Sequence, residues 1–389
     1  MSYVIRIPRI AAICCFPAFV FTSPANFSNI ASLQPEVLYM TRALELAQKG
    51  KGHTSPNPMV GAVLVNEGRI IGEGWHHIYG QAHAEVDCLN NVAAADKHLI
   101  AGSTMYVTLE PCAHTGKTPP CADRLVVEKI GKVVIANKDP FELVSGRGID
   151  ILKNTGIDVV TGVCEAEGQW VNRRFFTFHQ QKRPYIVLKW AQTTDGFIAP
   201  EDRSRSQITN GQSNRLVHKW RTEEAAIMVG ATTAINDDPQ LTARLWAGKQ
   251  PLRIAISRNA NIPSTHHLFD NSAETWIINE DKDDIINTVR YIQLSFGDQL
   301  LNEVMALLHQ QKLTSLIVEG GAALLNSFIN AGLWDEARVF TGNKEIGSGL
   351  TAPQLTNSTN TLTTHLNDDR LEVFVNKISP YPYTTGMEL

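Results

Sequence analysis

Four residues in the first half of this 389-residue chain restrict its fold more than any other feature. His83 and Glu85 stand two residues apart, Cys112 follows Pro111, and Cys121 comes nine residues later. One imidazole and two thiols form a ligand set for zinc, and with three protein ligands the metal keeps a fourth position for water. A fold that uses this set must bring three separate segments to one point.

The same residue types suit hydrolysis. Zinc lowers the pKa of its bound water from ~15.7 toward roughly 7, and a nearby carboxylate can carry a proton to a leaving amine. Zinc deaminases carry H-x-E followed by P-C-x-x-C, with the Glu as acid and base and not as a ligand. This chain has the first half of that signature, but its cysteines are more widely spaced. A single His or Cys more often packs in a core, so the prediction depends on the whole set.

Apolar periodicity predicts alternating helices and strands over residues 36–183, which indicates a three-layer α/β domain. Because Pro is favoured in the first turn of a helix, we expect Cys112 to begin one. The helix dipole and zinc would then both favour its thiolate. The expected helices cover 36–48, a stretch beginning near 82, a stretch beginning at 112, and 165–179; the expected strands cover 60–65, 69–74, 104–109 and 132–136.

The second half repeats the alternation, and we place the boundary at Arg183-Pro184, with a domain over 184–379 and a tail over 380–389. We expect polar loops at 281–284 and 356–364. The expected strands cover 185–191, 225–229, 252–257, 275–278, 313–318, 336–341 and 371–378, and the expected helices cover 213–224, 300–311 and 322–331.

Composition fits a globular protein with a full core, since 43% of the residues are hydrophobic and 19% are charged. The net charge of -4 argues against a nucleic-acid partner. Six cysteines do not indicate a disulfide scaffold, so we expect free thiols in a reducing compartment, the cytoplasm. We expect a homo-oligomer and no membrane partner.

Residues 1–35 allow three interpretations. Arg6 and Arg9 precede an apolar stretch over 10–21, which is typical of a signal peptide but short for a membrane span. Met40 could instead be the true start. We favour an extension that is irrelevant to the fold.

Together with Asn57 and His83-Ala84-Glu85, the segment Thr108 to Cys121 carries a resemblance to one family. The chain resembles the bifunctional riboflavin-biosynthesis deaminase–reductases, which join a cytidine-deaminase-like domain to a dihydrofolate-reductase-like domain. The long insert between the cysteines, ending Thr118-Pro119-Pro120-Cys121, is specific to that family among zinc deaminases. The resemblance extends from about Tyr39 to Ile378.

For the first half, the resemblance implies that His83, Cys112 and Cys121 bind zinc and that Glu85 shuttles protons. The substrate would be a diaminopyrimidinone that carries a phosphoribosylamino group, and its 2-amino group would leave as ammonia. An amide such as Asn57 can pair with a pyrimidine edge. We also assign substrate contacts to His76, His114 and Lys117, the last two at the ribose phosphate. An exposed loop, or for His76 a surface hairpin end, is the alternative.

The second half lacks G-x-G-x-x-G after a strand, but Gly320-Gly321 joins an expected strand to a helix. Consecutive glycines allow close approach of a ligand, and a helix N-terminus attracts phosphate, although a tight turn explains them equally well. The resemblance implies that NADPH contacts Ala191, Gln207, Thr233, Asp237, Gly321, Ala322, Ala323, Leu324, Leu325, Asn326 and Ser327. It implies substrate contacts for Arg205, Arg221, Leu241, Arg244 and Glu319. The guanidiniums of Arg221 and Arg244 are suited to a phosphate.

Three positions depart from the family pattern. Phe197 stands where a lysine is common, Gln207 where a tryptophan is frequent, and Arg205 where a serine is frequent. Either the ligands are held differently or the reductase is impaired, and we favour the first because the glycine turn and both arginines are intact. The remaining alternatives are a deaminase of another nucleobase fused to a pterin-type reductase, and a second half that only binds ligands.

Overall fold

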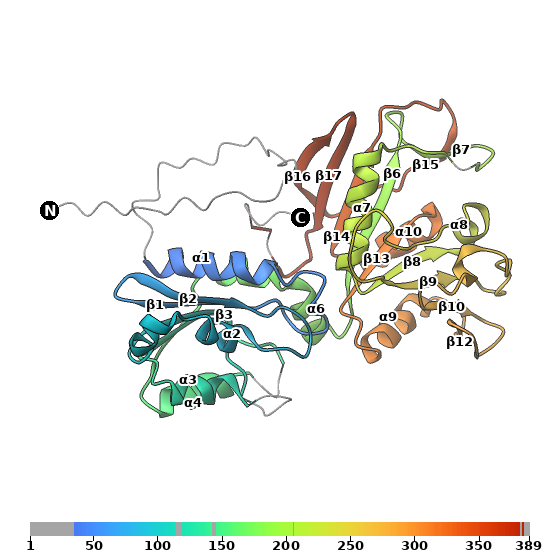
Figure 1. Ribbon diagram of the computed structural model, residues 1–389. Helices are drawn as coiled ribbons and strands as arrows, with labels where there is room; N and C mark the ends of the chain where they lie inside the picture. Colours follow the sequence, from blue (N-terminus) through green and yellow to red (C-terminus); the bar gives the residue numbers. More distant parts are fainter. Residues whose placement is uncertain (1–34, 114–118, 142–144, 205, 382, 385–389) are drawn as a thin grey trace.

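The first half of the chain folds around a five-stranded sheet with helices on both faces (Figure 1). The computed structural model describes residues 35–113, 119–141, 145–204, 206–381 and 383–384. The strand order is β2-β1-β3-β4-β5, with β1 antiparallel to β2 and β3, and β3, β4 and β5 parallel. The strands are β1 (Gly61–Asn66), β2 (Arg69–Trp75), β3 (Thr104–Leu109), β4 (Lys132–Asn137) and β5 (Asp158–Thr161).

Alternate residues of these strands enter two separate cores, because successive strand side chains point to opposite faces. Val63 packs with α1 (Pro35–Gln48) and α5 (Glu165–Val171), whereas Leu64 packs on the other face. That second face is covered by α2 (Ala84–Asn90), α3 (Cys121–Val127) and α4 (Arg147–Asn154), and the short helix η2 (Ala94–Leu99) follows α2. The expected three-layer domain is confirmed.

Two local expectations in this half are wrong. The helix expected at Cys112 begins at Cys121, and Cys112 lies on the connection after β3. The aromatic-rich helix expected over 165–179 is two helices, α5 and α6 (Arg173–Gln181). The break falls at Asn172, whose side chain accepts from the Met59 amide and donates to the Met59 carbonyl, both at 2.8 Å. Asn competes in this way for backbone partners and therefore interrupts helices.

The second half contains a ten-stranded sheet with the order β11-β12-β10-β9-β8-β13-β6-β14-β17-β16. All neighbours from β12 to β14 are parallel, and the outer strands β11, β17 and β16 are antiparallel. The strands are β6 (Tyr185–Gln192), β8 (Ala226–Gly230), β9 (Leu252–Ile256), β10 (Thr275–Asn279), β11 (Asp284–Ile286), β12 (Val289–Gln293), β13 (Ser315–Glu319), β14 (Glu336–Thr341), β16 (Ser358–Leu366) and β17 (Asp369–Asn376).

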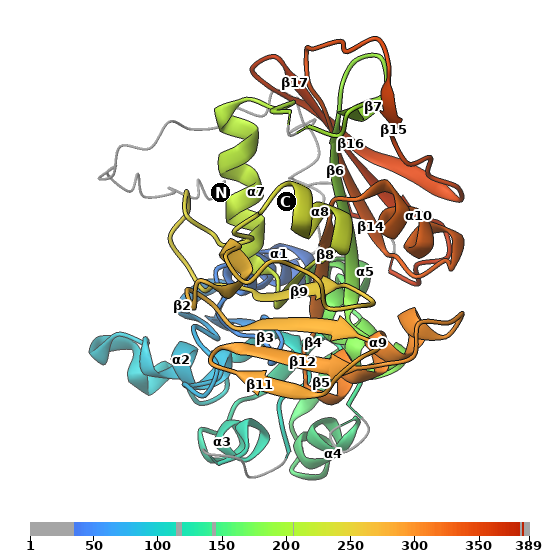
Figure 2. The ribbon, with the colours of Figure 1, turned by 90° about the vertical axis from the view of Figure 1, so that its right-hand side faces the viewer.

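Helices cover both faces of this sheet as well. Figure 2 shows α7 (Gly211–Glu223) and α10 (Ala322–Asn330) on opposite sides of β6. Core residues of α9 (Leu300–Gln310) join those of α10, and core residues of α8 (Ala231–Asn236) join those of α7. A two-stranded sheet, β7 (Phe197–Pro200) with β15 (Gly349–Thr351), and the short helix η3 (His267–Phe269) complete the half.

The expected loop at 356–364 is wrong, because β16 runs through it as an edge strand paired to β17. Its residues are largely polar and partly exposed, so they lack the apolar alternation that predicts strands. The expected loop at 281–284 holds except for Asp284, where β11 begins.

Buried and partly buried ion pairs join the two halves. Arg173 contacts Glu336 at 3.0 Å, Lys51 contacts Glu223 at 3.3 Å, and Arg174 pairs with Glu224. A charge left unpaired in such a place costs about 3–5 kcal/mol, so these pairs specify one arrangement of the halves. Within the described ranges, no helix is both long and apolar enough to cross a membrane.

Candidate active sites

The structure brings His83, Cys112 and Cys121 together. His83 precedes the first residue of α2, Cys112 follows β3, and Cys121 begins α3. Their ligand atoms all lie within 4.8 Å of one another. The Nδ1 atom of His83 is 3.5 Å from the Cys112 sulfur and 3.3 Å from the Cys121 sulfur. Two thiols and one imidazole at these separations fit a tetrahedral zinc ion, with a fourth position open.

The start of α3 contacts the Cys112 sulfur, although Cys112 lies outside that helix. The backbone amide of Cys121 donates to the Cys112 sulfur at 3.3 Å. Hydrogen bonding from the Cys121 thiol, with His83 beside it, lowers the pKa of Cys112 to about 4. Cys112 is therefore held as a thiolate, the form that binds metal, although it does not itself begin a helix.

Glu85 lies in the first turn of α2 and lines the same cavity as His83 and Cys112. Its side chain is buried, and burial together with the Cys112 thiolate raises the pKa of Glu85 to about 7. Its carboxylate is not among the three clustered ligands. A carboxyl group poised near neutral pH can both accept and release a proton.

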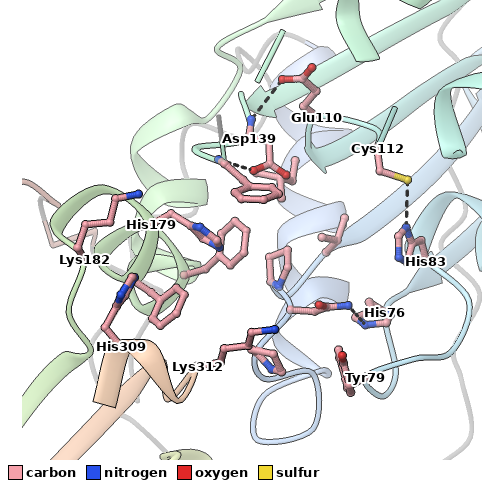
Figure 3. Close-up of a pocket in the computed structure, with 18 of the residues that line it drawn as sticks. His76, Tyr79, His83, Glu110, Cys112, Asp139, His179, Lys182, His309 and Lys312 are labelled. Carbon is pink, nitrogen blue, oxygen red and sulfur yellow. Dashed lines mark hydrogen bonds between the residues drawn. The ribbon is translucent and has the colours of Figure 1, made fainter. Parts of the chain in front are cut away.

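The cavity beside these residues has a volume of about 610 Å³ and lies between the two halves of the chain (Figure 3). Asn57 and His76 line it, with Asn57 Nδ2 at 3.4 Å from His76 Nε2. His76 is buried, and its Nδ1 donates to the Ala82 carbonyl at 3.0 Å, so Nε2 is left as an acceptor. The alternative of a surface hairpin end is wrong for His76. His114 and Lys117 lie outside the described residues.

Glu110 is part of this site, and the sequence reasoning missed it. Its carboxylate accepts from the amides of Asp139, Gly146, Gly148 and Ile149 at 3.0–3.4 Å. These bonds tie the residue before Pro111-Cys112 to the start of α4. A side chain at Gly148 would place its Cβ 2.0 Å from the Pro111 carbonyl oxygen. The signal that could have found this contact is an acidic residue at the end of a buried strand, directly before Pro-Cys.

In the second half, Gly320 and Gly321 form the turn from β13 into α10 with φ of 88° and 73°. A Cβ at either position would lie 3.1 Å from the Thr233 side chain, so the turn and Thr233 form one tight surface. This close backbone approach at a helix start fits a phosphate group of a dinucleotide. Along α10, Ala323, Asn326 and Ser327 are exposed, Leu324 is half-buried, and Ala322 and Leu325 are buried.

A charged cluster lies at the end of β13. Arg221 donates to both carboxylate oxygens of Glu319, at 3.0 and 2.8 Å, and the Lys189 ammonium is 3.7 Å from Glu319. Burial alone would raise the pKa of Glu319, but Arg221 and Lys189 lower it to about 2. Arg221 donates to the Thr242 carbonyl at 3.1 Å and Arg244 donates to the Thr242 hydroxyl at 3.4 Å, which places Arg244 beside the cluster.

Lys189 was also missed from the sequence. It is the one charged side chain in the apolar strand β6, and burial lowers its pKa. A lysine that interrupts such a strand could have indicated a functional position, because a buried charge is costly unless an opposite charge pairs with it.

The remaining predicted residues of this half are spread out. Ala191 lies in β6 and Asp237 directly follows α8, whereas Leu241 is buried with a φ of 57°. Gln207 is exposed, donates to the Thr209 carbonyl at 3.2 Å, and accepts from Lys344 at 2.7 Å through its own carbonyl. Arg205 lies outside the described residues.

Comparisons with known proteins agree with this arrangement. Residues 184–379 match the family described as RibD C-terminal domain, and residues 34–137 match the cytidine and deoxycytidylate deaminase zinc-binding region. The riboflavin biosynthesis protein RibD of Aquifex aeolicus is 42% identical over 82% of this chain and 89% of its own length. The chain belongs to the RibD family. The RibD protein of Bacillus amyloliquefaciens is 39% identical over 82% of this chain and 87% of its own.

Solved structures of the RibD family have the same fold. A Thermotoga maritima diaminohydroxyphosphoribosylaminopyrimidine deaminase/5-amino-6-(5-phosphoribosylamino)uracil reductase is 33% identical, with a TM-score of 0.80 over 88% of this chain and 99% of that one. RibD of Acinetobacter baumannii is 32% identical with a TM-score of 0.80, covering 88% and 98%. This RibD-family enzyme is thus a bifunctional riboflavin-biosynthesis deaminase and reductase, which argues against a fusion of another deaminase with a pterin-type reductase.

Proposed function

We propose that this RibD-family enzyme deaminates 2,5-diamino-6-(5-phosphoribosylamino)pyrimidin-4-one by hydrolysis and then reduces the ribosyl side chain to ribityl with NADPH. The observation that carries the proposal is the cluster of His83, Cys112 and Cys121, of which His83 and Cys112 line one cavity together with the buried Glu85. The Thermotoga relative, which is named for both activities, supports the choice of substrate.

In the deaminase site, His83 Nδ1 and the sulfurs of Cys112 and Cys121 would hold zinc. Zinc, when bound, supplies an activated water. Glu85 would take the proton from the attacking water and deliver it to the 2-amino group. The C–O bond forms first, by addition to C2, and the C–N bond then breaks as ammonia leaves. Asn57 orients the pyrimidine edge, and the hydrogen bond to Ala82 fixes the tautomer of the neighbouring His76.

In the reductase site, the turn at Gly320-Gly321 and Thr233 would hold NADPH, which supplies the hydride. Arg244 is suited to the substrate phosphate, because a guanidinium offers two parallel donors. Arg221 already donates to both oxygens of Glu319 and to the Thr242 carbonyl, so it would act on the substrate through its positive charge. Glu319 keeps Arg221 and Lys189 oriented as cations. These pairs support a working reductase over a second half that only binds ligands, even with Phe197 and Gln207 in place.

We also propose the domain division 36–183 and 184–379, with action in the cytoplasm. The described cysteines, Cys88, Cys112, Cys121 and Cys164, are free thiols, as in a reducing compartment. The homo-oligomer stays a prediction.

The test is the Glu85→Ala variant of the full chain. Ammonia release should fall below detection while zinc content and NADPH oxidation with deaminated substrate remain at wild-type levels. Surviving deamination would contradict the assigned proton transfer. Absence of NADPH oxidation in the wild-type enzyme, given deaminated substrate, would instead show that the second half has lost catalysis.

A further inference from the structure

The deaminase cavity is not closed by the deaminase half alone. One side is formed by Asn57, His76 and two of the candidate zinc ligands, His83 and Cys112, which together with Cys121 are called the metal cluster below. The other side is formed by the end of α6 and the end of α9. Figure 3 shows His83 and Cys112 on the first side, with His179, Lys182 and His309 opposite them. His309 and Lys312 belong to the reductase half, so a residue pair far away in sequence completes this cavity.

The side opposite the metal cluster carries two lysines and two histidines. His179, Lys182, His309 and Lys312 all line it, and Lys312 extends into the space between the two sides (Figure 3). The rings of Phe178 and His309 pack with centroids 4.3 Å apart, which joins the end of α6 to α9. These four residues are called the basic wall below.

The ammonium groups of the basic wall have no carboxylate partner within the described residues. The carboxylates that line the cavity are Glu85, Glu110 and Asp139, which all belong to the first sheet and its connections. Glu110 is already occupied by backbone amides. Among the described residues, no carboxylate therefore competes with an anion that enters the cavity and contacts Lys182 and Lys312.

We infer that the reductase half supplies part of the deaminase site, with Lys182 and Lys312 binding the phosphate end of the substrate while its pyrimidine lies at Asn57 and the metal cluster. This inference rests on the proposed function, and it adds Lys182 and Lys312 to the phosphate contacts that the family resemblance implies for His114 and Lys117, which lie outside the described residues. A cavity of about 610 Å³ is large enough for a small nucleotide-sized ligand. Two lysines bind phosphate as point charges, and His179 and His309 add ring nitrogens as hydrogen-bonding groups.

Consequently the basic wall distinguishes a phosphorylated substrate from its dephosphorylated form. Both lysines act on binding and not on the bond that breaks, since the reacting carbon lies at the metal cluster. The expected effect is thus on KM and not on kcat.

The experiment compares the full-length wild-type enzyme with the Lys182→Gln/Lys312→Gln double variant. Ammonia release is measured with the phosphorylated substrate and with its dephosphorylated form. The KM for the phosphorylated substrate should rise roughly tenfold or more per lysine, as for a lost charge-assisted hydrogen bond. The kcat, and both constants for the dephosphorylated form, should stay unchanged. Inorganic phosphate should inhibit the wild-type enzyme and inhibit the variant more weakly.

Lys129→Gln is the matched control, because Lys129 is an exposed lysine just after a helix and has a left-handed backbone, φ of 55°, like Lys182 and Lys312. Zinc content and NADPH oxidation, measured on the same preparations, show that the double variant is folded. Equal KM values for the two enzymes, or an equal rise with both substrates, would overturn the inference. Failure of the wild-type enzyme to release ammonia would overturn the proposed function instead.

Discussion

Glu85 and Glu319 are both buried carboxylic acids, one in each half, and their surroundings drive them in opposite directions. Burial and a neighbouring thiolate raise the pKa of Glu85 to about 7. Burial acts on Glu319 as well, but Arg221 and Lys189 lower its pKa to about 2. The first group can exchange a proton near neutral pH, whereas the second is a fixed anion that orients two cations. The positive charges beside Glu319 belong to side chains of the protein, Arg221 and Lys189. The positive charge beside Glu85 would instead come from a bound metal ion.

The largest expected effect separates the two sites by their dependence on metal. Replacing Cys121 by Ser removes one of three ligands, so zinc content and ammonia release should both fall to background. NADPH oxidation with deaminated substrate should be unchanged, because the Glu319 cluster uses no metal ligand. Metal analysis and the two activity assays on one preparation provide the measurement. A parallel loss of NADPH oxidation would break the comparison.

The Lys189→Met variant tests the other half in the same way. It removes one of the two cations beside Glu319 and keeps an apolar side chain of similar length in β6. We expect kcat/KM of the reductase to fall by about 100-fold, as for the loss of a buried charged contact of about 3 kcal/mol. Ammonia release should stay at the wild-type rate. An unchanged reductase would show that Lys189 serves packing alone.

The stability of the enzyme at acid pH should show that Glu319 is an anion in the folded state. Because the folded-state pKa of Glu319 is depressed from 4.5 to about 2, its contribution to stability is present above about pH 4.5 and is lost as the pH falls toward 2. The free energy of unfolding of the wild-type enzyme should drop in this window by up to about 3 kcal/mol more than that of Glu319→Gln. Urea unfolding at pH values across the window measures it. Identical pH dependence would mean that Glu319 is not an anion in the folded state.

The smallest effect concerns the turn that precedes α10. Gly321→Ala puts a Cβ 3.1 Å from Thr233 Oγ1 at a φ of 73°, and this strain costs about 1–2 kcal/mol. We expect the KM for NADPH to rise by roughly tenfold, with no change in ammonia release. Gly297→Ala, where a Cβ meets nothing within 4 Å, is the control and should leave both activities unchanged.

The sequence predicted the fold well where burial and periodicity agree. The strand expected at 104–109 has those bounds, because it is buried on both faces and bounded by polar residues. The helix expected at Cys112 failed because the nine-residue spacing gives room for a loop, and the preceding carboxylate, Glu110, fixes that loop to the distant α4. Asn172 ended a helix through contacts to Met59, which is 113 residues away.

The same distinction applies to the sites. The metal cluster could be predicted because its motif residues lie within 39 positions and carry unusual chemistry. Lys189, Glu110 and the basic wall could not, because each acquires its role from partners that only the tertiary structure brings close.

The ion pairs between the halves have a consequence for protein engineering. Expressing either half alone would expose this buried surface and remove the carboxylate partners of Arg173 and Arg174, whereas Glu336 would keep Arg338 in its own half. Splitting the enzyme into two monofunctional proteins would therefore require redesign of that surface, for example by replacing each ion pair with neutral side chains. The two activities are thus linked by the packing between the halves as well as by the peptide bond that joins them.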